Sequence, residues 1–226
     1  MPEASPAAFF DVDGTLLKSN IVEYLGFFQR HRLPPWAWRR WLLLTLAKAP
    51  GYFALDQVSR VAFCRWFYRS YRGLPVDEVT ALSQPLFEGV IRPRLRAEAL
   101  RTVEQHRSHG HTVVLLSGGL DFIVQPLAVH LGAQVVIAAE LEERGGRFTG
   151  RLATPPLTND GKAIAIARFT RQWEIDARAC FAYGDSISDL PMLEAVGQAN
   201  AVTPDRRLRT IAARRGWPIH EWNHPQ

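Results

Sequence analysis

Short apolar segments at three places in the chain each end in small and acidic residues. Residues 7–10 are followed by Asp11-Val12-Asp13-Gly14, residues 111–116 by Ser117-Gly118-Gly119, and residues 179–183 by Gly184-Asp185. Runs of this kind are typical of strands buried on both faces, which occur in parallel sheets covered by helices. Open α/β sheets bind ligands beyond the carboxyl ends of their strands. The sequence therefore predicts an α/β fold with a polar site at one edge of the sheet.

The chain beyond residue 93 alternates helical and strand patterns. Helices are predicted at 94–109, 121–131, 161–173 and 190–196, and again up to residue 215. Strands are predicted at 111–116, 134–138, 179–183, 199–202 and 218–220, with a hairpin turn at residues 144–147. This alternation indicates parallel βαβ units with right-handed crossovers. We expect a doubly wound, mostly parallel, Rossmann-like sheet.

Residues 19–92 differ in composition from the rest of the chain. They hold ten basic and five acidic residues, whereas the remainder is balanced, and they carry 14 of the 24 aromatic residues. Helical patterns run through this stretch, interrupted at 34–35, 50–51 and 73–75, and residues 57–72 have an aromatic side and an arginine side. We predict a helical domain at 19–92, inserted after the first strand of a core formed by 1–18 and 93–226.

Composition and spacing exclude several classes of protein. Cys64 and Cys180 have no paired spacing, which favours two buried, reduced thiols in a cytoplasmic protein. The N-terminus lacks the features of a signal peptide, and the most apolar stretch, residues 41–47, is far shorter than the ~20 residues of a membrane span. The net charge is +5, but no nucleic-acid-binding motif accompanies it, so we expect no nucleic-acid partner.

Polar residues occupy the predicted ends of strands and helices. They are Asp11, Asp13, Ser117, Lys162, Asp185 and Asp189. Four acids that share a single crevice with one lysine would repel one another, and a divalent cation with an anionic substrate would relieve that repulsion. Carboxylates suit octahedral Mg²⁺, whereas lysine, serine and glycine amides suit phosphate oxygens. A carboxylate beside such a phosphate can attack phosphorus, and a second acid two residues away can protonate the leaving oxygen.

Each of these motifs also has a purely structural interpretation. The pair Asp11 and Asp13 is compatible with an ordinary turn, residues 117–119 with a loop, and Asp189 with a helix cap. Lys162 is less ordinary, because cations are disfavoured at a helix N-terminus and the chain has three lysines against 24 arginines. The order of the motifs and their shared placement at element ends favour a functional site.

Four segments together resemble the motifs of the haloacid dehalogenase superfamily. They are FFDVDGTL at 9–16, LLSGG at 115–119, GKA at 161–163 and YGDSISDLPML at 183–193. With the hairpin at 146–152, they are similar to the phosphoserine-phosphatase-like branch, subfamily IB. The resemblance implies an α/β core with a helical cap inserted after the first strand. It also implies a Mg²⁺-dependent phosphomonoester phosphatase that acts through an aspartyl-phosphate intermediate.

The resemblance implies a role for each matching residue. Asp11 would be the nucleophile and a metal ligand, Asp13 the general acid/base with its backbone carbonyl on the metal, and Asp185 the other direct ligand. An acid at position 13 separates phosphatases from dehalogenases, which lack one there. The residues expected to hold the phosphoryl oxygens are Gly14, Ser117, Gly118 and Lys162, with Asp189 and Ser188 in supporting roles.

Some positions depart from the pattern of phosphoserine phosphatases and leave the substrate open. Gly14 replaces a serine, Ser188 replaces an asparagine, and Asn20 stands where a glutamate binds the substrate ammonium. Glu23, one helical turn further on, is a candidate substitute, and Arg65 is a candidate substrate contact on the predicted arginine face. We expect the substrate to be a small phosphorylated metabolite or a lipid phosphate.

Three other functions stay open at this stage. Tryptophans and arginines at 36–41, followed by leucines, fit an interfacial helix on anionic lipid, so a phospholipid head-group phosphatase with peripheral membrane contact is one hypothesis. Packing of the cap explains the same residues. A phosphotransferase and a catalytically silent lipid- or protein-binding module are the remaining alternatives. The sequence does not determine the oligomeric state.

Overall fold

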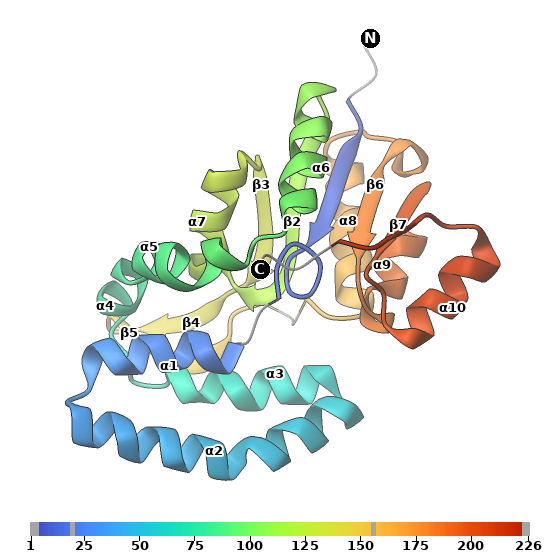
Figure 1. The fold of residues 1–226 in the computed structure, drawn as a ribbon. Coiled ribbons are helices and arrows are strands. Elements are labelled where there is room, and N and C mark those ends of the chain that lie inside the picture. Colours follow the sequence, from blue (N-terminus) through green and yellow to red (C-terminus); the bar gives the residue numbers. More distant parts are fainter. Residues whose placement is uncertain (1–4, 19–20, 155–156, 223–226) are drawn as a thin grey trace.

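A six-stranded parallel sheet forms the centre of the structure (Figure 1). The structure is a computed structural model that describes residues 5–18, 21–154 and 157–222, without the side chains of 52–58 and 60. In spatial order the strands are β3 (Val135–Ala139), β2 (Thr112–Leu120), β1 (Ala7–Asp11), β6 (Phe181–Gly184), β7 (Gln198–Val202) and β8 (Ile219–His220). The chain winds outward from β1 in both directions, which confirms the predicted doubly wound sheet. Such a reversal leaves a crevice beyond the carboxyl ends of the central strands.

Helices cover both faces of this sheet. On one face lie α6 (Ala97–Ser108) and α7 (Asp121–Leu131), and on the other α8 (Asp160–Gln172), α9 (Leu190–Glu194) and α10 (Arg206–Arg215). Successive residues of β1 point to opposite faces: Phe10 stacks on Tyr183 with ring centroids 4.6 Å apart, whereas Phe9 meets Phe169 edge to face at 5.5 Å. All five residues of β1 are buried, so the strand is a rigid base for Asp11 at its end.

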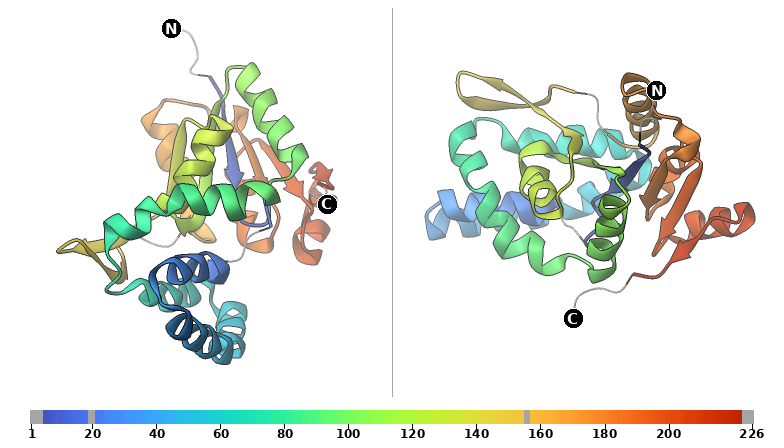
Figure 2. Two further views of the ribbon diagram at one scale, coloured as in Figure 1. Left: turned by 60° about the vertical axis from the view of Figure 1, so that its left-hand side comes forward. Right: turned by 90° about the horizontal axis from the view of Figure 1, so that it is seen from above.

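Three helices form a separate layer beyond the carboxyl ends of the strands. They are α1 (Ile21–Arg32), α2 (Pro35–Val58) and α3 (Arg60–Tyr68), and α2 is the outermost in Figure 1. The left view of Figure 2 shows the same separation between this helical layer and the sheet. Short elements return the chain to α6: η1 (Arg69–Tyr71), α4 (Val76–Ala81), α5 (Ser83–Leu86), a π-helical turn η2 (Phe87–Ile91) and η3 (Arg92–Arg94).

The predicted interruption at Pro50-Gly51 is wrong, because α2 continues through both residues to Val58. A proline inside a helix leaves one carbonyl without its donor. Pro50 and Leu46, four residues before it, are both exposed, so water can hydrate that carbonyl. The helix is interrupted instead at Ser59, whose backbone is extended and whose hydroxyl accepts the amide N–H of Ala62 at 3.2 Å. The breaks predicted at 34–35 and 73–75 are confirmed.

The remaining elements follow the sequence pattern with small shifts. The hairpin predicted around residues 144–147 is formed by β4 (Leu141–Arg144) and β5 (Arg147–Leu152). Two further short segments, η4 (Ala177–Ala179) and η5 (Ile187–Asp189), flank β6. Cys64 and Cys180 are buried free thiols, as expected. Among the described residues, no helix combines the length and apolarity that a membrane crossing requires.

Candidate active site

A tight turn after β1 brings Asp11, Asp13 and Gly14 to the crevice. Gly14 has a φ of +104°, and its N–H donates to the carbonyl oxygen of Leu17 at 2.8 Å. A Cβ atom on Gly14 would lie 2.3 Å from Oδ2 of Asp185, a distance that real atoms do not reach. Glycine is therefore required here for two reasons, the backbone conformation and the close approach of Asp185.

Lys162 lies in the first turn of α8 and is buried between two carboxylates. Its Nζ donates to Oδ1 of Asp11 and, at 2.6 Å, to Oδ1 of Asp189. The other oxygen of Asp189 accepts the amide N–H groups of Asp185 and Ser186, both at 3.2 Å. The loop after β6 therefore holds Asp189 in place, and Asp189 in turn holds the lysine against the end of β1.

Asp11, Asp185 and Asp189 form a cluster in which one carboxylate oxygen from each lies within 4.8 Å of the others. Burial, together with the neighbouring acids and despite the opposing charge of Lys162, raises the pKa of Asp11 to about 7. Burial, followed by the charges of Asp11 and Asp189, raises the pKa of Asp185 to about 8. Burial alone would lower the pKa of Lys162, but the two carboxylates raise it above its usual value. When fully ionised, the three acids carry more negative charge than one lysine can neutralise.

The donor set of this cluster fits a hard divalent cation. Its atoms are all carboxylate oxygens, which is the chemistry that Mg²⁺ prefers. Oδ2 of Asp11 is buried and has no hydrogen-bond partner among the described residues, an arrangement that is costly unless another group binds there. The side chain that completes the cluster is Asp189, whereas the side chain of Asp13 points to a different partner.

That partner of Asp13 is Ser117, near the irregular end of β2. Ser117 Oγ donates to Oδ2 of Asp13 at 3.0 Å and accepts the N–H of Gly119 at 2.9 Å. We expected the strand to end before Ser117, but β2 continues to Leu120 with a shift in register after Leu116. The irregularity turns the backbone of residues 117–119 toward the crevice.

The crevice is a cleft of about 840 Å³ lined by the acids of the cluster, Asp13 and Lys162. The core contributes the loops after β1, β2 and β6 and the start of α8, and the helical layer contributes Ser59, Cys64 and Tyr68. The hydroxyl of Tyr68 donates to the carbonyl oxygen of Gly118 at 2.7 Å, which ties the helical layer to the core at the site. Oγ1 of Thr158 also lines the cleft, buried and without a partner among the described residues.

The structure brings together most of the residues that the sequence singled out. Asp11, Asp13, Gly118, Lys162, Asp185, Ser188 and Asp189 all line the cleft, and Gly14 and Ser117 contact residues that do. Ser188 Oγ lies 2.7 Å from Ser186 Oγ. The roles assigned to these residues stay predictions.

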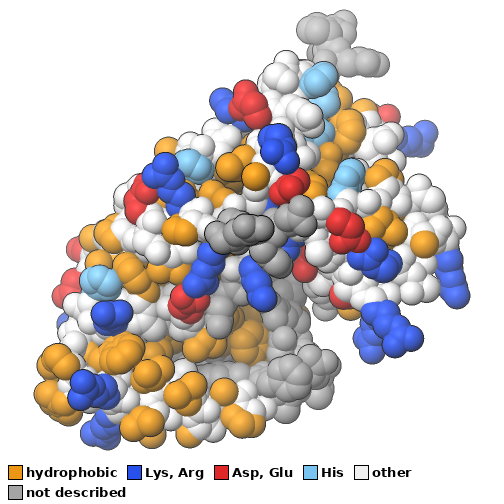
Figure 3. Space-filling view, viewed as in Figure 1, with side chains coloured by type: hydrophobic (Ala, Val, Ile, Leu, Met, Phe, Trp, Pro, Cys, Tyr) orange, Lys and Arg blue, Asp and Glu red, His pale blue; other side chains and the backbone are white. Residues whose placement is uncertain are grey.

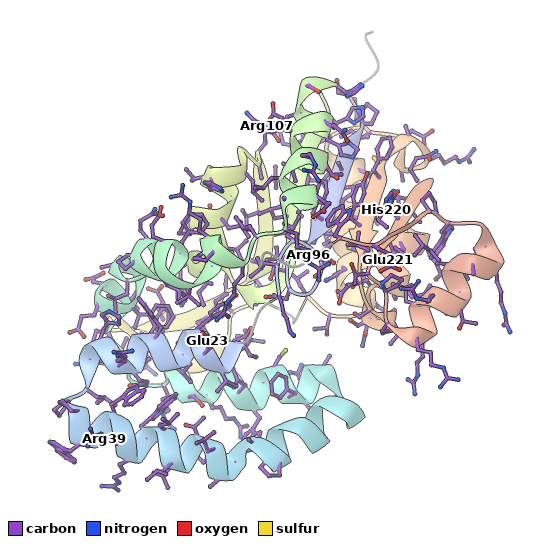
Figure 4. All side chains as sticks on the ribbon, viewed as in Figure 1. Glu23, Arg39, Arg96, Arg107, His220 and Glu221 are labelled. Atoms are coloured by element: carbon purple, nitrogen blue, oxygen red, sulfur yellow. The ribbon has the colours of Figure 1, made fainter. Side chains whose placement is uncertain are left out.

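The residues proposed for substrate specificity are placed differently. Glu23 does not line the cleft, because both of its carboxylate oxygens accept the guanidinium of Arg94 at 2.6 Å, at the junction of α1 and the core (Figure 4). Arg65 is exposed on α3 and is not part of the lining either. Asn20 lies outside the described residues. A contact between any of the three and a substrate stays a prediction.

Sequence reasoning missed several residues of the site. Thr15 Oγ1 donates to Asp185 at 3.3 Å, and Asp205 accepts the N–H groups of Ile187 and Leu208, both at 2.8 Å. Asp205 precedes a helical pattern and could have been recognised as its cap. Arg206 and Arg207 follow it, line the cleft and are exposed, and neither forms an ion pair within the described part of the chain. No sequence signal connects these two arginines with the distant motifs.

Comparisons with known proteins show the family and the fold of this chain. A model of the haloacid dehalogenase-like hydrolase family matches residues 8–194. The chain is 34% identical over 231 residues to a probable phosphatase of Mycobacterium tuberculosis, covering 99% of this chain and 78% of that protein. It is 30% identical to a phosphoserine phosphatase of the same organism, covering 97% and 72%. A solved phosphoserine phosphatase with a phospho-aspartyl intermediate analogue superimposes with a TM-score of 0.68 at 18% identity, covering 98% and 95%, and so has the same fold.

Proposed function

Because the chain belongs to the haloacid dehalogenase-like hydrolase family and is a phosphatase, we propose that it hydrolyses phosphomonoesters with Mg²⁺ through a phosphoryl group carried on Asp11. The observation that carries the proposal is the buried cluster of Asp11, Asp185 and Asp189 around Lys162, with one oxygen of Asp11 left unpartnered. A purely structural role would not require so much buried negative charge at the floor of an open cleft.

The chemistry divides into two steps performed by neighbouring carboxyl groups. The carboxylate of Asp11 attacks phosphorus, and the bond between phosphorus and the substrate oxygen breaks. Asp13, half-buried and hydrogen-bonded to Ser117, gives its proton to the departing alcohol. The resulting Asp13 carboxylate then removes a proton from water, which attacks the phosphoryl group and releases inorganic phosphate. Asp11 returns as a carboxylate and Asp13 as an acid.

Other residues of the cleft hold the reacting groups in position. Lys162 places its ammonium group beside Asp11, where it attracts both that carboxylate and the phosphoryl oxygens. The backbone near Gly118 and the unpartnered hydroxyl of Thr158 offer further contacts to phosphate oxygens. We assign Mg²⁺ to Asp11 and Asp185, with the backbone carbonyl of Asp13, and to Asp189 in support. The ion supplies charge neutralisation for the phosphoryl group when bound.

We extend the proposal to the helical layer, which we take to be the cap of residues 19–92. Tyr68 places the cap on the backbone of Gly118, so a closed cap restricts entry of water to the cleft. The substrate enters between the cap and the loops after β1, β2 and β6.

The test of the function is the variant Asp11→Asn, assayed with p-nitrophenyl phosphate. We expect no turnover, because the amide cannot form the phosphorylated intermediate, and an unchanged melting curve in excess EDTA would show that the fold survives. Asp77→Asn, an exposed acid on α4, is the matched control and should retain full activity. Acid-quenched wild-type protein should carry phosphate on the peptide that contains Asp11. Turnover by Asp11→Asn, or by wild-type protein in EDTA, would refute the mechanism.

The cleft also points to the kind of phosphomonoester that it accepts. Arg206 and Arg207 line the cleft, and their guanidinium groups form no ion pair with a described residue. We therefore propose that the substrate carries a second anionic group. A matched pair of substrates, 3-phosphoglycerate and glycerol 3-phosphate, differs mainly in one carboxylate. Replacing both arginines with glutamine should raise KM about tenfold for 3-phosphoglycerate only, which corresponds to ~1.4 kcal/mol. An equal change for both substrates would contradict this assignment.

A lipid phosphate is the second candidate substrate. The observation that bears on it is the exposed apolar and basic outer face of α2, which would hold the protein at a membrane that contains such lipids. A lipid would have to leave that membrane to enter the cleft, because the cleft lies on the other side of the helical layer. A cytoplasmic location with peripheral contact to a membrane belongs to the same proposal. Vesicles that contain phosphatidic acid, compared with a soluble short-chain analogue, would distinguish the two candidates: release of phosphate from the soluble molecules alone would exclude the lipid.

A further inference from the structure

The outer face of α2 exposes large apolar side chains in a way that no other described helix does. Of the eight exposed large hydrophobic residues in the described part of the chain, four lie within eleven residues of this helix. They are Trp36 at 69% exposure, Leu43 at 68%, Leu44 at 53% and Leu46 at 59%. The other four are scattered over the core. A cluster of this kind on a soluble protein marks a surface that another molecule covers.

The spacing along α2 places these residues on one side. At 100° per residue, positions 36, 40, 43 and 47 fall on one line, with 39, 44, 46 and 50 beside it. All eight positions are exposed. Positions 37, 38, 41, 42 and 45 fall on the opposite side and are only partly exposed, because that side packs toward α1 and α3. The helix is therefore apolar on its packed side and also on the side that faces away from the protein.

The charges on this outer face all have one sign. Arg39 and Arg40 are exposed there, and no acidic residue occurs between Glu23 and Asp56. Neither arginine forms an ion pair with a described residue. Figure 3 shows basic and hydrophobic side chains interspersed along the lower edge of the molecule, where α2 runs, and Figure 4 labels Arg39 on that helix. The surface that covers this face must be apolar inside and anionic at its rim.

We propose that the outer face of α2 docks on an anionic lipid surface, with Trp36, Leu43, Leu44 and Leu46 in the interface and Arg39 and Arg40 against the head groups. Helices that combine apolar residues with arginine and lysine lie in the plane of such a surface. A second copy of the chain is disfavoured as the occupant, because a symmetric contact would join two faces that carry arginines and no acidic residue to pair with them. The helix lies on the membrane, since no described helix qualifies to cross it.

Docking in this orientation is compatible with access to the active site. The helix α2 is the outermost part of the helical layer, and the cleft lies on the far side of that layer, lined by Ser59, Cys64 and Tyr68 (Figure 1). The lipid surface and the reaction centre are therefore separate. The proposed docking of α2 on lipid does not depend on the proposed chemistry of the cleft.

Vesicle flotation with the full-length protein tests the proposal. The probes are vesicles of phosphatidylcholine alone and vesicles with one third phosphatidylglycerol, each at low and high salt. We expect flotation only with the anionic vesicles and weaker flotation at high salt. The variant Leu43→Gln/Leu44→Gln should reduce binding about 100-fold, and Arg39→Gln/Arg40→Gln about tenfold. All variants should hydrolyse p-nitrophenyl phosphate at the wild-type rate, because none of these residues lines the cleft.

Two matched control variants lie on the core. Val129→Gln replaces an apolar residue that is 80% exposed on α7, and Arg168→Gln/Arg171→Gln removes two exposed arginines from α8. Both should float as the wild type does. Failure of the wild type to bind anionic vesicles would overturn the proposal, and so would an equal loss in the controls. A dimer in light scattering that Leu43→Gln/Leu44→Gln dissociates would overturn it too, and would assign the face to a second copy.

Discussion

The buried lysine of the site allows a quantitative test of the electrostatic argument. In Lys162→Met, a side chain of similar length removes the only described cation that contacts Asp11 and Asp189, whose side chains are 5% and 2% exposed. Two unit charges 4.8 Å apart repel by roughly 3.5 kcal/mol at an effective dielectric constant of 20. Breaking a buried ion pair by removing one partner typically costs about 3–5 kcal/mol. We therefore expect the metal-free variant to lose about 3–5 kcal/mol of unfolding free energy at pH 8.

The loss should depend on pH in a definite direction. The pKa values of Asp11 and Asp185 are raised to about 7 and about 8 in the folded protein, well above the usual value of 3.8. The folded protein therefore binds more protons than the unfolded chain between pH 4 and pH 8, and the stability contribution of these acids falls as pH rises through that window. At pH 5 they are largely protonated in the fold and repel little. The cost of Lys162→Met should accordingly be much smaller at pH 5 than at pH 8.

Urea unfolding in EDTA, followed by circular dichroism at both pH values, measures this difference. Lys48→Met, which removes an exposed lysine of α2, is the control and should change stability by less than about 0.5 kcal/mol. Because Lys162→Met is at risk of not folding at pH 8, the double variant Lys162→Met/Asp189→Asn serves as a second measurement and should recover part of the loss. An equal loss at both pH values, or no recovery in the double variant, would refute the reasoning.

Two further predictions concern the turn after β1 and the histidines of the core. Gly14→Ala should lose about 1–2 kcal/mol from its positive φ and roughly 10²-fold in kcat with p-nitrophenyl phosphate, because the added methyl displaces Asp185. Gly110 has a φ of +75° and open space around it, so Gly110→Ala should lose a similar amount of stability and keep the wild-type activity. Burial and the neighbouring His111 and His109 lower the pKa of His106 to about 4. The contribution of neutral His106 to the free energy of unfolding is therefore complete above pH 6.5 and is lost as pH falls toward 4. Melting curves of the wild type should show a loss of about 2–3 kcal/mol over this pH range. In His106→Gln, whose side chain can still bond Tyr183, stability should depend less on pH. An equal dependence of stability on pH in both proteins would contradict the assignment.

Local patterns were sufficient to predict the core of the fold. Apolar runs that alternate with amphipathic segments indicated which residues are buried. Helical connections between strands such as β1 and β2 make them parallel, and the same helices bury both faces of the sheet. The same patterns misplaced the break in α2, because proline is unfavourable in a helix only where its missing hydrogen bond cannot be replaced. Water replaces it at Pro50, which is exposed.

The candidate site was predictable wherever chemistry is tied to an element end. Asp11, Lys162 and Asp185 each end a strand or begin a helix, so a parallel sheet brings them together whatever the details of packing. The sequence alone thus determined the fold class and the acids and lysine that meet at the floor of the cleft, but not Asp205, Arg206 and Arg207.

Only the tertiary structure decided which partner each group takes. Glu23 binds Arg94, Asp189 joins the carboxylate cluster, and Arg206 and Arg207 reach a cleft most of whose other residues lie far away in the sequence. Tertiary structure also determines which side of α2 is exposed. The two sides of this helix are equally apolar, and packing against α1 and α3 covers one of them. The physical reason is that periodicity records burial of a residue, whereas hydrogen bonds and ion pairs depend on distances between segments that no local pattern contains.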